Sequence, residues 1–204
     1  EALGPFWASE DRIIFFVDRG GDERFELYAV NHDGSDPSIL NPERSPRLLR
    51  RLKDDRRSIL VQAGMTHRDW PDVTRMDLKT GRLNNVPIAK APGPVSGYVL
   101  DRDNVVRFAM LRDPESRTNK VLYRTANKEA WTELATFGFD QPGWRPIAFD
   151  GDNRTIYIAS DIGRKTFAIY RYDTVSGSHL QPELVFGDDT YDMAGVVYDD
   201  FKKK

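Results

Sequence analysis

The sequence predicts an all-β fold of the β-propeller class, built from four four-stranded blades and the start of a fifth. The first observation is a recurring unit in which an acidic turn leads into a short β-forming run. Its markers are Asp11, Asp55, Asp103 and Asp152, at spacings of 44, 48 and 49 residues, with Asp200 opening a fifth copy. The second observation is an apolar strand that recurs at spacings of 46, 49 and 47, beginning at Leu27, Val73, Leu122 and Ile169. A period in the forties with strands inside it is the signature of a propeller blade.

The predicted blades cover about residues 5–40, 46–88, 93–137, 143–187 and 193–204, the last of them partial. Within a blade, alternating apolar and polar residues indicate strands, and Gly, Asn and Asp indicate the turns. In the first two blades a short apolar segment, Phe6–Ser9, comes first. We expect strands at Ile13–Val17, Phe25–Val30, Ser38–Leu40, Leu48–Leu52, Ser58–Gln62, Val73–Leu78 and Arg82–Val86.

In the next two blades the expected strands are Val95–Leu100, Val105–Leu111, Lys120–Thr125, Trp131–Phe137, Trp144–Phe149, Thr155–Ser160, Phe167–Tyr172 and Glu183–Phe186. The fifth blade begins at Met193–Tyr198. One segment, Pro46–Leu52, also fits a helix, because Leu48, Leu49 and Leu52 have i, i+1, i+4 spacing. Since the repeat places a first strand there, we predict a strand. A meander of four strands cannot bury both sheet faces alone, so each blade is expected to stack on its neighbours within one domain.

Composition excludes several classes of function. The net charge is −2 in a chain of 204 residues with 30% charged residues, which argues against a nucleic-acid partner held by phosphate neutralisation, since that needs a basic face. Cysteine is absent, so a disulfide framework, a thiolate metal site and a cysteine nucleophile are all excluded. No run of about 18 apolar residues is present, and we therefore predict no membrane span.

Three stretches resemble the N-terminal propeller of the prolyl oligopeptidase family, especially its bacterial acylaminoacyl-peptidase and dipeptidyl-aminopeptidase-like branch. Phe6-Trp7-Ala8, followed by Ile13–Glu23 with Asp-Arg-Gly-Gly-Asp-Glu at its end, is similar to one blade of that branch. Arg68–Gly81 is similar to a strand and turn with the pattern D-V-Y-R-x-D-L-x-T-G. Asp192–Asp199 looks like a later D-V-G-G-V-x-x-D segment.

The resemblance implies a two-domain serine peptidase with a propeller and an α/β-hydrolase. A hydrolase needs a serine in a Gly-x-Ser-x-Gly turn, but no serine here is flanked in this way; Ser96 has Pro94 and Tyr98 at those positions. We therefore expect a fragment without a catalytic residue, which begins at a second blade. Its implied role is to gate and size peptide substrates for the hydrolase domain of the parent chain. The implied compartment is that of a bacterial-type protein, cytoplasmic or periplasmic.

Four residues are predicted to bind substrate. In the related enzymes, loops that face the hydrolase hold peptide termini, which here points to Arg19, Asp22, Glu23 and Arg68. A carboxylate pairs with an α-amino group, and an arginine grips a carboxylate with two parallel hydrogen bonds. The alternative is a Gly-Gly loop with solvated charges or an Arg19–Asp22 pair. The same choice between substrate binding and solvated charges applies to the corresponding loop of the next blade, His67–Trp70.

Other polar clusters favour a structural reading. His32, His67 and His179 lack metal-ligand spacing, and the pairs Asp101/Asp103, Asp150/Asp152 and Asp188/Asp189 are typical of turns. We expect no metal and no cofactor. The basic cluster at Arg44, Arg47, Arg50, Arg51, Lys53, Arg56 and Arg57 is expected to be a solvated face.

Two further classes of function remain open. One is a stand-alone propeller that serves as a protein-binding module. The other is an enzyme with its site in the propeller, which would need two carboxylates at about 5–10 Å. Four blades do not close a larger ring, so we also expect self-association through open blade edges.

Overall fold

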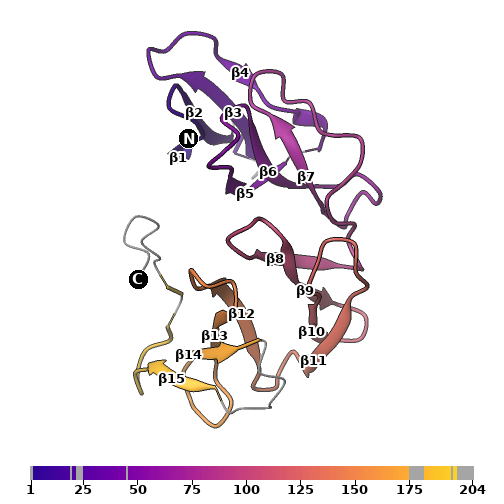
Figure 1. The fold of residues 1–204 in the computed structure, drawn as a ribbon, viewed down its shortest axis with the longest axis vertical. Coiled ribbons are helices and arrows are strands. Elements are labelled where there is room, and N and C mark those ends of the chain that lie inside the picture. The colour runs from indigo at the N-terminus through magenta and orange to yellow at the C-terminus, as the bar shows by residue number, and fades with distance from the viewer. Residues whose placement is uncertain are drawn as a thin grey trace. The chain divides into compact units, whose positions relative to one another are not determined.

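The computed structural model describes residues 2–18, 20–21, 25–44, 46–174, 182–193 and 195–196. The chain forms two compact units, Glu1–Gly93 and Pro94–Lys204, which are taken separately below. Figure 1 shows that the regular elements of the described residues are strands, apart from one 3-10 turn, η1 (Pro42–Arg44). In the described part of the chain, no helix is long and apolar enough to cross a membrane.

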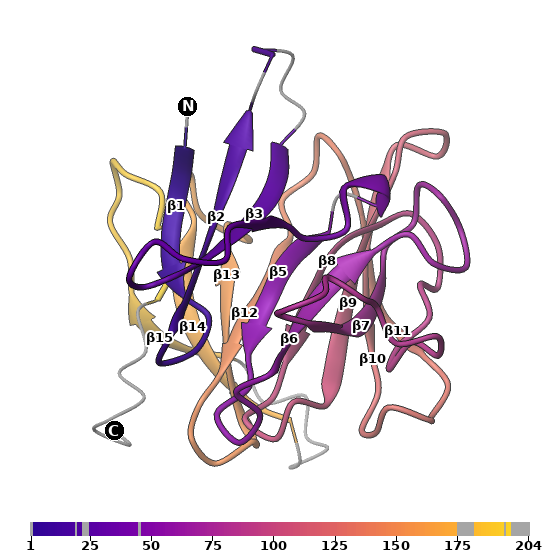
Figure 2. The same ribbon diagram turned by 90° about the horizontal axis from the view of Figure 1, so that it is seen from above.

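The first unit contains two antiparallel sheets. The first sheet has the order β1 (Ala2–Trp7), β2 (Arg12–Asp18), β3 (Phe25–Asn31) and β4 (Ser38–Ile39). The second has the order β5 (Arg47–Arg51), β6 (Ser58–Ala63) and β7 (Asp72–Asp77). Figure 2 shows β1, β2 and β3 side by side from above. β5 is a strand, as the repeat predicted, and the helical reading of Pro46–Leu52 is wrong.

The expected fourth strand at Arg82–Val86 does not form. Within the described residues, the segment after β7 pairs with β7 only through two isolated antiparallel β-bridges, Met76 to Leu83 and Val73 to Ala89. Pro87 lies between these bridges and has no N–H group for a ladder hydrogen bond, which breaks a continuous pairing.

The second unit contains two four-stranded antiparallel sheets. One consists of β8 (Val95–Leu100), β9 (Val106–Asp113), β10 (Thr118–Tyr123) and β11 (Thr132–Gly138). The other consists of β12 (Trp144–Phe149), β13 (Thr155–Ser160), β14 (Ala168–Asp173) and β15 (Glu183–Phe186). In both sheets each strand pairs with its neighbour in sequence, so each sheet is a meander. Most of the expected fifth blade lies outside the described residues.

The four marker aspartates lie between the first and second strands of their sheets, as predicted. Asp55 accepts a hydrogen bond from the N–H of Arg57 at 3.0 Å, and Asp152 accepts from the N–H groups of Arg154 and Thr155 at 2.9 and 2.8 Å. Asn104 and Asn153 adopt positive φ angles of 65° and 55° in the last two of these turns. Asparagine tolerates that backbone conformation better than most residues, which explains its place there.

The sheets stack in pairs within each unit. In the first unit, Ile14, Leu27 and Ala29 of the first sheet share a buried cluster with Ile59 and Val61 of the second. In the second unit, the corresponding buried cluster joins the two sheets through Val99, Phe108, Val121, Phe149, Ile156 and Ile158. The burial of apolar surface between sheets is therefore what holds each unit together.

The repeat alignment of the third strands was off by one residue in the third sheet. Leu27 packs on the sheet that follows its own, and in β10 the residue that does so is Val121, not Leu122. With Val121 in place of Leu122, the spacings become 46, 48 and 48. A one-residue slip moves every side chain to the opposite face of a strand, so the packing fixes this register although the sequence pattern did not.

Candidate functional site

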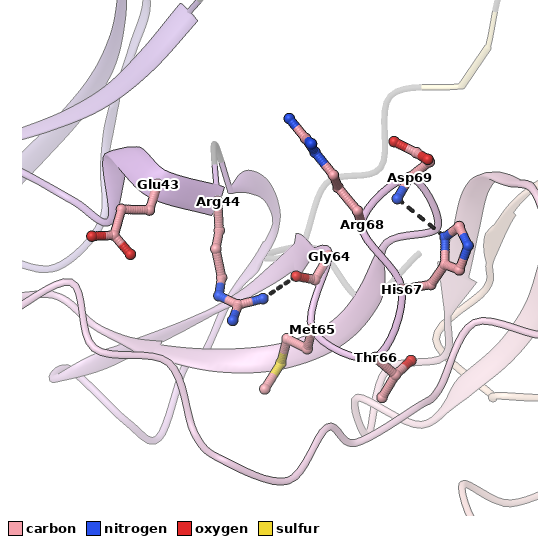
Figure 3. A pocket seen from close by; sticks show the side chains of 8 residues that line it. All are labelled: Glu43, Arg44, Gly64, Met65, Thr66, His67, Arg68 and Asp69. Atoms are coloured by element: carbon pink, nitrogen blue, oxygen red, sulfur yellow. Dashed lines mark hydrogen bonds between the residues drawn. The ribbon is translucent and has the colours of Figure 1, made fainter.

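A polar hollow of about 590 Å³ lies in the first unit, at the loop that joins β6 to β7. Eight residues from this loop and from η1 line it: Glu43, Arg44, Gly64, Met65, Thr66, His67, Arg68 and Asp69. Figure 3 shows Glu43 and Arg44 on one side of it and the loop residues on the other. Its volume is in the range of small-molecule sites, but its lining is largely polar and not apolar.

Asp72 anchors the loop. Its carboxylate is fully buried and accepts hydrogen bonds from the N–H groups of Met65 and Thr66 at 3.2 and 2.7 Å. The hydroxyl of Thr66 and the N–H of Ala91 complete the set at 3.0 and 2.7 Å. Four donors satisfy the buried charge, so the start of the loop is held to the first residue of β7.

Gly64 allows the start of the loop to lie close to the middle of the loop. A Cβ atom at this position would lie 2.5 Å from the carbonyl oxygen of Arg68 and 2.8 Å from that of His67. The carbonyl group of Gly64 also accepts a hydrogen bond from the guanidinium of Arg44 (Figure 3), which ties η1 to the loop. Only glycine leaves room for this arrangement.

His67 and Trp70 form a stacked pair at the exposed part of the loop. Their ring centroids are 4.2 Å apart, and the planes are inclined by 21°. The N–H of Asp69 donates to Nδ1 of His67 at 3.2 Å. The stack and this hydrogen bond together orient the imidazole ring.

Three charged groups of the hollow have no polar partner among the residues that the structure describes. They are the guanidinium of Arg68 and the carboxylates of Glu43 and Asp69, all on exposed residues. A free guanidinium can bind a carboxylate through two parallel N–H donors, and a free carboxylate can accept from an ammonium group. The hollow can therefore bind small charged ligands.

Of the four residues predicted to bind substrate, Arg68 lies in this hollow. Arg19, Asp22 and Glu23 lie outside the described residues, so their placement beside Arg68 stays a prediction. Sequence reasoning missed Glu43 and Asp72. Asp72 follows the loop directly and begins an apolar strand, and that position at a strand start was the available signal.

The acidic pairs act in turns, as expected. Asp101 accepts from the N–H groups of Asp103 and Val105, and it also forms a buried ion pair with Arg107 at 3.0 Å. The backbone N–H groups of Thr190 and Tyr191 hold the pKa of Asp188 below its ordinary value. Among the described residues, no group of three or more His, Asp or Glu side chains could hold a metal ion.

The histidines and the basic cluster are only partly as expected. His32 is an exposed turn residue, His67 is exposed but stacked on Trp70, and His179 lies outside the described residues. In the basic cluster, Arg44 binds the carbonyl of Gly64, and Arg56 pairs with Glu10. The cluster is thus divided between separate contacts and does not form one anion site.

Comparison with known proteins finds a peptidase that is similar to this chain. No family model matches the sequence. The chain is 30% identical over 200 residues to dipeptidyl aminopeptidase BIII of Pseudoxanthomonas mexicana. The match covers 95% of this chain and 28% of the relative, so the chain spans little more than a quarter of that protein's length.

Solved structures show the fold. The putative TolB of Agrobacterium tumefaciens matches 92% of this chain and 62% of its own, with a TM-score of 0.55 and 13% identity. A prolyl endopeptidase structure, from a study of inter-domain dynamics in two such enzymes, matches 93% of this chain and 30% of its own, with a TM-score of 0.53 and 14% identity. These likenesses confirm the all-β propeller class. The sequence match to dipeptidyl aminopeptidase BIII, together with the sequence motifs, supports the resemblance to the N-terminal propeller of the prolyl oligopeptidase family.

Proposed function

We propose that this chain is the non-catalytic propeller portion of a serine peptidase of the prolyl oligopeptidase family. In this proposal it gates and sizes peptide substrates for an α/β-hydrolase domain of the same protein. The observation that carries the proposal is the match of 95% of the chain to a dipeptidyl aminopeptidase. By that likeness, the products would be short peptides, dipeptides among them.

The chemistry of the chain supports a gating role and not a catalytic one. The sequence holds no serine in a Gly-x-Ser-x-Gly turn and no cysteine, so the nucleophile must come from outside this chain. What the chain supplies is a set of stacked, well-packed sheets with polar loops at their ends. Packed sheets of this kind can exclude folded proteins by size and leave a path for short peptides.

Arg68 is proposed to orient substrates at the loop that joins β6 to β7. Its guanidinium has no partner in the described residues, and its loop is fixed by Asp72 and Gly64. A peptide carboxylate can therefore bind Arg68 without breaking an existing ion pair. The proposal extends this role to Arg19, Asp22 and Glu23 on the resemblance alone.

The test uses the complete gene product that contains this chain. Its cleavage rate is measured on a short peptide and on a folded carrier protein that displays the same sequence in a surface loop. A gate predicts efficient cleavage of the free peptide and of the unfolded carrier, with little cleavage of the folded carrier. Equal rates on folded and unfolded carrier, or a gene product without a hydrolase domain, would overturn the proposal.

The role of Arg68 is tested in the same assay. Arg68→Ala should raise KM for short peptides with little change in kcat, because it removes binding and not chemistry. The matched control is Arg82→Ala, an exposed arginine of the same unit outside the hollow. If both variants behave alike, Arg68 has no specific role in binding. If the chain is instead a protein-binding module, the complete gene product should bind a folded partner protein and cleave no peptide.

A further inference from the structure

The charges of the hollow at the β6–β7 loop indicate what kind of ligand fits it. Arg44 and Arg68 contribute two positive charges to its lining, and Glu43 and Asp69 contribute two negative charges. The formal charges therefore cancel, which disfavours a polyanion or a polycation and favours a ligand that itself carries one charge of each sign.

The groups available for binding also differ in sign. Arg44 already donates to the carbonyl of Gly64, so Arg68 is the cation left for a ligand anion. Both carboxylates are left for a ligand cation, since neither has a partner among the described residues. Figure 3 shows Arg68 and Asp69 extending from adjacent positions of the loop, with Glu43 across the hollow on η1.

We propose that this hollow is a binding site for free zwitterionic dipeptides. The α-carboxylate binds the guanidinium of Arg68, and the α-ammonium binds Glu43 or Asp69. This inference rests on the proposed function, because a dipeptide is the product that such a peptidase releases. A product dipeptide bound there would compete with substrate for the guanidinium of Arg68. A volume of about 590 Å³ is ample for a dipeptide.

The loop is built to keep this charge arrangement. Asp72 holds Met65 and Thr66, Gly64 allows the tight return of the chain, and the His67–Trp70 stack fixes the outer part. Because these contacts do not involve the guanidinium of Arg68, a ligand can bind it without disrupting the loop. Preorganisation of this kind lowers the cost of binding.

Isothermal titration of this chain with Ala-Ala and its blocked derivatives tests the proposal. Ala-Ala should bind saturably and more weakly as salt rises. N-acetyl-Ala-Ala and Ala-Ala amide, which each lack one charge, should bind about tenfold more weakly, the loss of one charge-assisted hydrogen bond. The doubly blocked peptide should not bind. If the doubly blocked peptide binds as tightly as Ala-Ala, or if Ala-Ala does not bind, the proposed site is wrong.

Variants assign the charges. In Arg68→Gln, Ala-Ala and Ala-Ala amide should bind equally, whereas Arg82→Gln should behave as wild type. Either Glu43→Gln or Asp69→Asn should make Ala-Ala and N-acetyl-Ala-Ala bind with equal affinity. If neither does, the ammonium is not held by these carboxylates and the proposal fails. The titration involves no bond cleavage, so its failure removes the site and leaves the cleavage test of the peptidase proposal unaffected.

Discussion

The buried carboxylate of Asp72 accepts both the backbone N–H and the hydroxyl of Thr66, at 2.7 and 3.0 Å. Asp72 is fully buried, whereas the loop that it holds is exposed from Thr66 to Trp70. An interior residue thus determines where an exposed arginine, Arg68, can lie.

Asp72→Asn is expected to destabilise the first unit by about 1–3 kcal/mol, because an amide group would point a donor at a backbone donor and leave one of them unsatisfied. Urea denaturation measures the change. Hydrogen exchange at the amides of Met65 and Thr66 should also become faster. Asp69→Asn is the control in the same loop, and it should stay within about 0.5 kcal/mol of wild type. Equal losses in the two variants would show that Asp72 is not an anchor.

Gly64→Ala is expected to distort the loop, since the new Cβ would meet the backbone oxygens of Arg68 and His67. Backbone atoms cannot move aside cheaply, so the loss should be about 1–3 kcal/mol. At Gly97 the contact at 2.9 Å is with the terminal methyl of Met110, which can rotate away. Thermal denaturation should therefore show a larger loss for Gly64→Ala than for Gly97→Ala. The reverse order would contradict the assigned role of Gly64.

The repeat of strands could be predicted from the sequence, but the register of the third strand in the third sheet could not. Turn residues and strand periodicity predicted the order of strands, because Asp, Asn and Gly act locally. The position of Val121 depends on contacts between two sheets, and no local pattern distinguishes it from Leu122. The missing strand at Arg82–Val86 has a local cause, Pro87, which the repeat pattern outweighed in the prediction.

The site was predictable only in part. Arg68 was identified through resemblance, but the partners of its loop come from elsewhere in the sequence. Glu43 and Arg44 reach the hollow from η1, and Ala91 donates to Asp72 across 19 residues. Such contacts follow from the packing of the second sheet, which spacing in the sequence does not reveal.

The buried ion pair of Asp101 and Arg107 is expected to stabilise the second unit. Their side chains are only 4% and 11% exposed, and Arg107 also lies over the rings of Tyr123 and Phe149 at 5.3 and 5.2 Å. Asp101→Asn would leave the buried guanidinium without its counter-charge and should cost about 3 kcal/mol. The exposed pair Arg117–Asp140 is the control, and Asp140→Asn should change the unfolding free energy little. Similar values from urea denaturation would contradict this role.

Acid should weaken the turn after β7. The hydroxyl of Thr80 is the largest cause that lowers the pKa of Asp77, with the N–H groups of Thr80 and Lys79 adding to it and burial opposing it. A carboxyl group with a lowered pKa in the folded state stabilises fully above its ordinary value of 3.8, and this stabilisation is lost as the pH falls through the lower folded-state value.

Asp77→Asn should therefore flatten the dependence of unfolding free energy on pH in that acidic range, and Thr80→Val should flatten it partly. Denaturation curves recorded across the range provide the measurement. An unchanged slope in Asp77→Asn would show that the turn makes no contribution to acid sensitivity.

The edge strand β15 is expected to promote self-association of this chain. Leu184, Val185 and Phe186 are 51%, 48% and 60% exposed, and in the described sheet β15 pairs only with β14. An exposed apolar edge offers unpaired backbone groups to a second copy. Light scattering should show a mass that rises with concentration, and Phe186→Lys should reduce the rise because it places a charge on that edge. Val86→Lys is the matched control, since Val86 is 77% exposed but outside any strand. A wild-type chain that stays monomeric at every concentration would exclude β15 as an association edge.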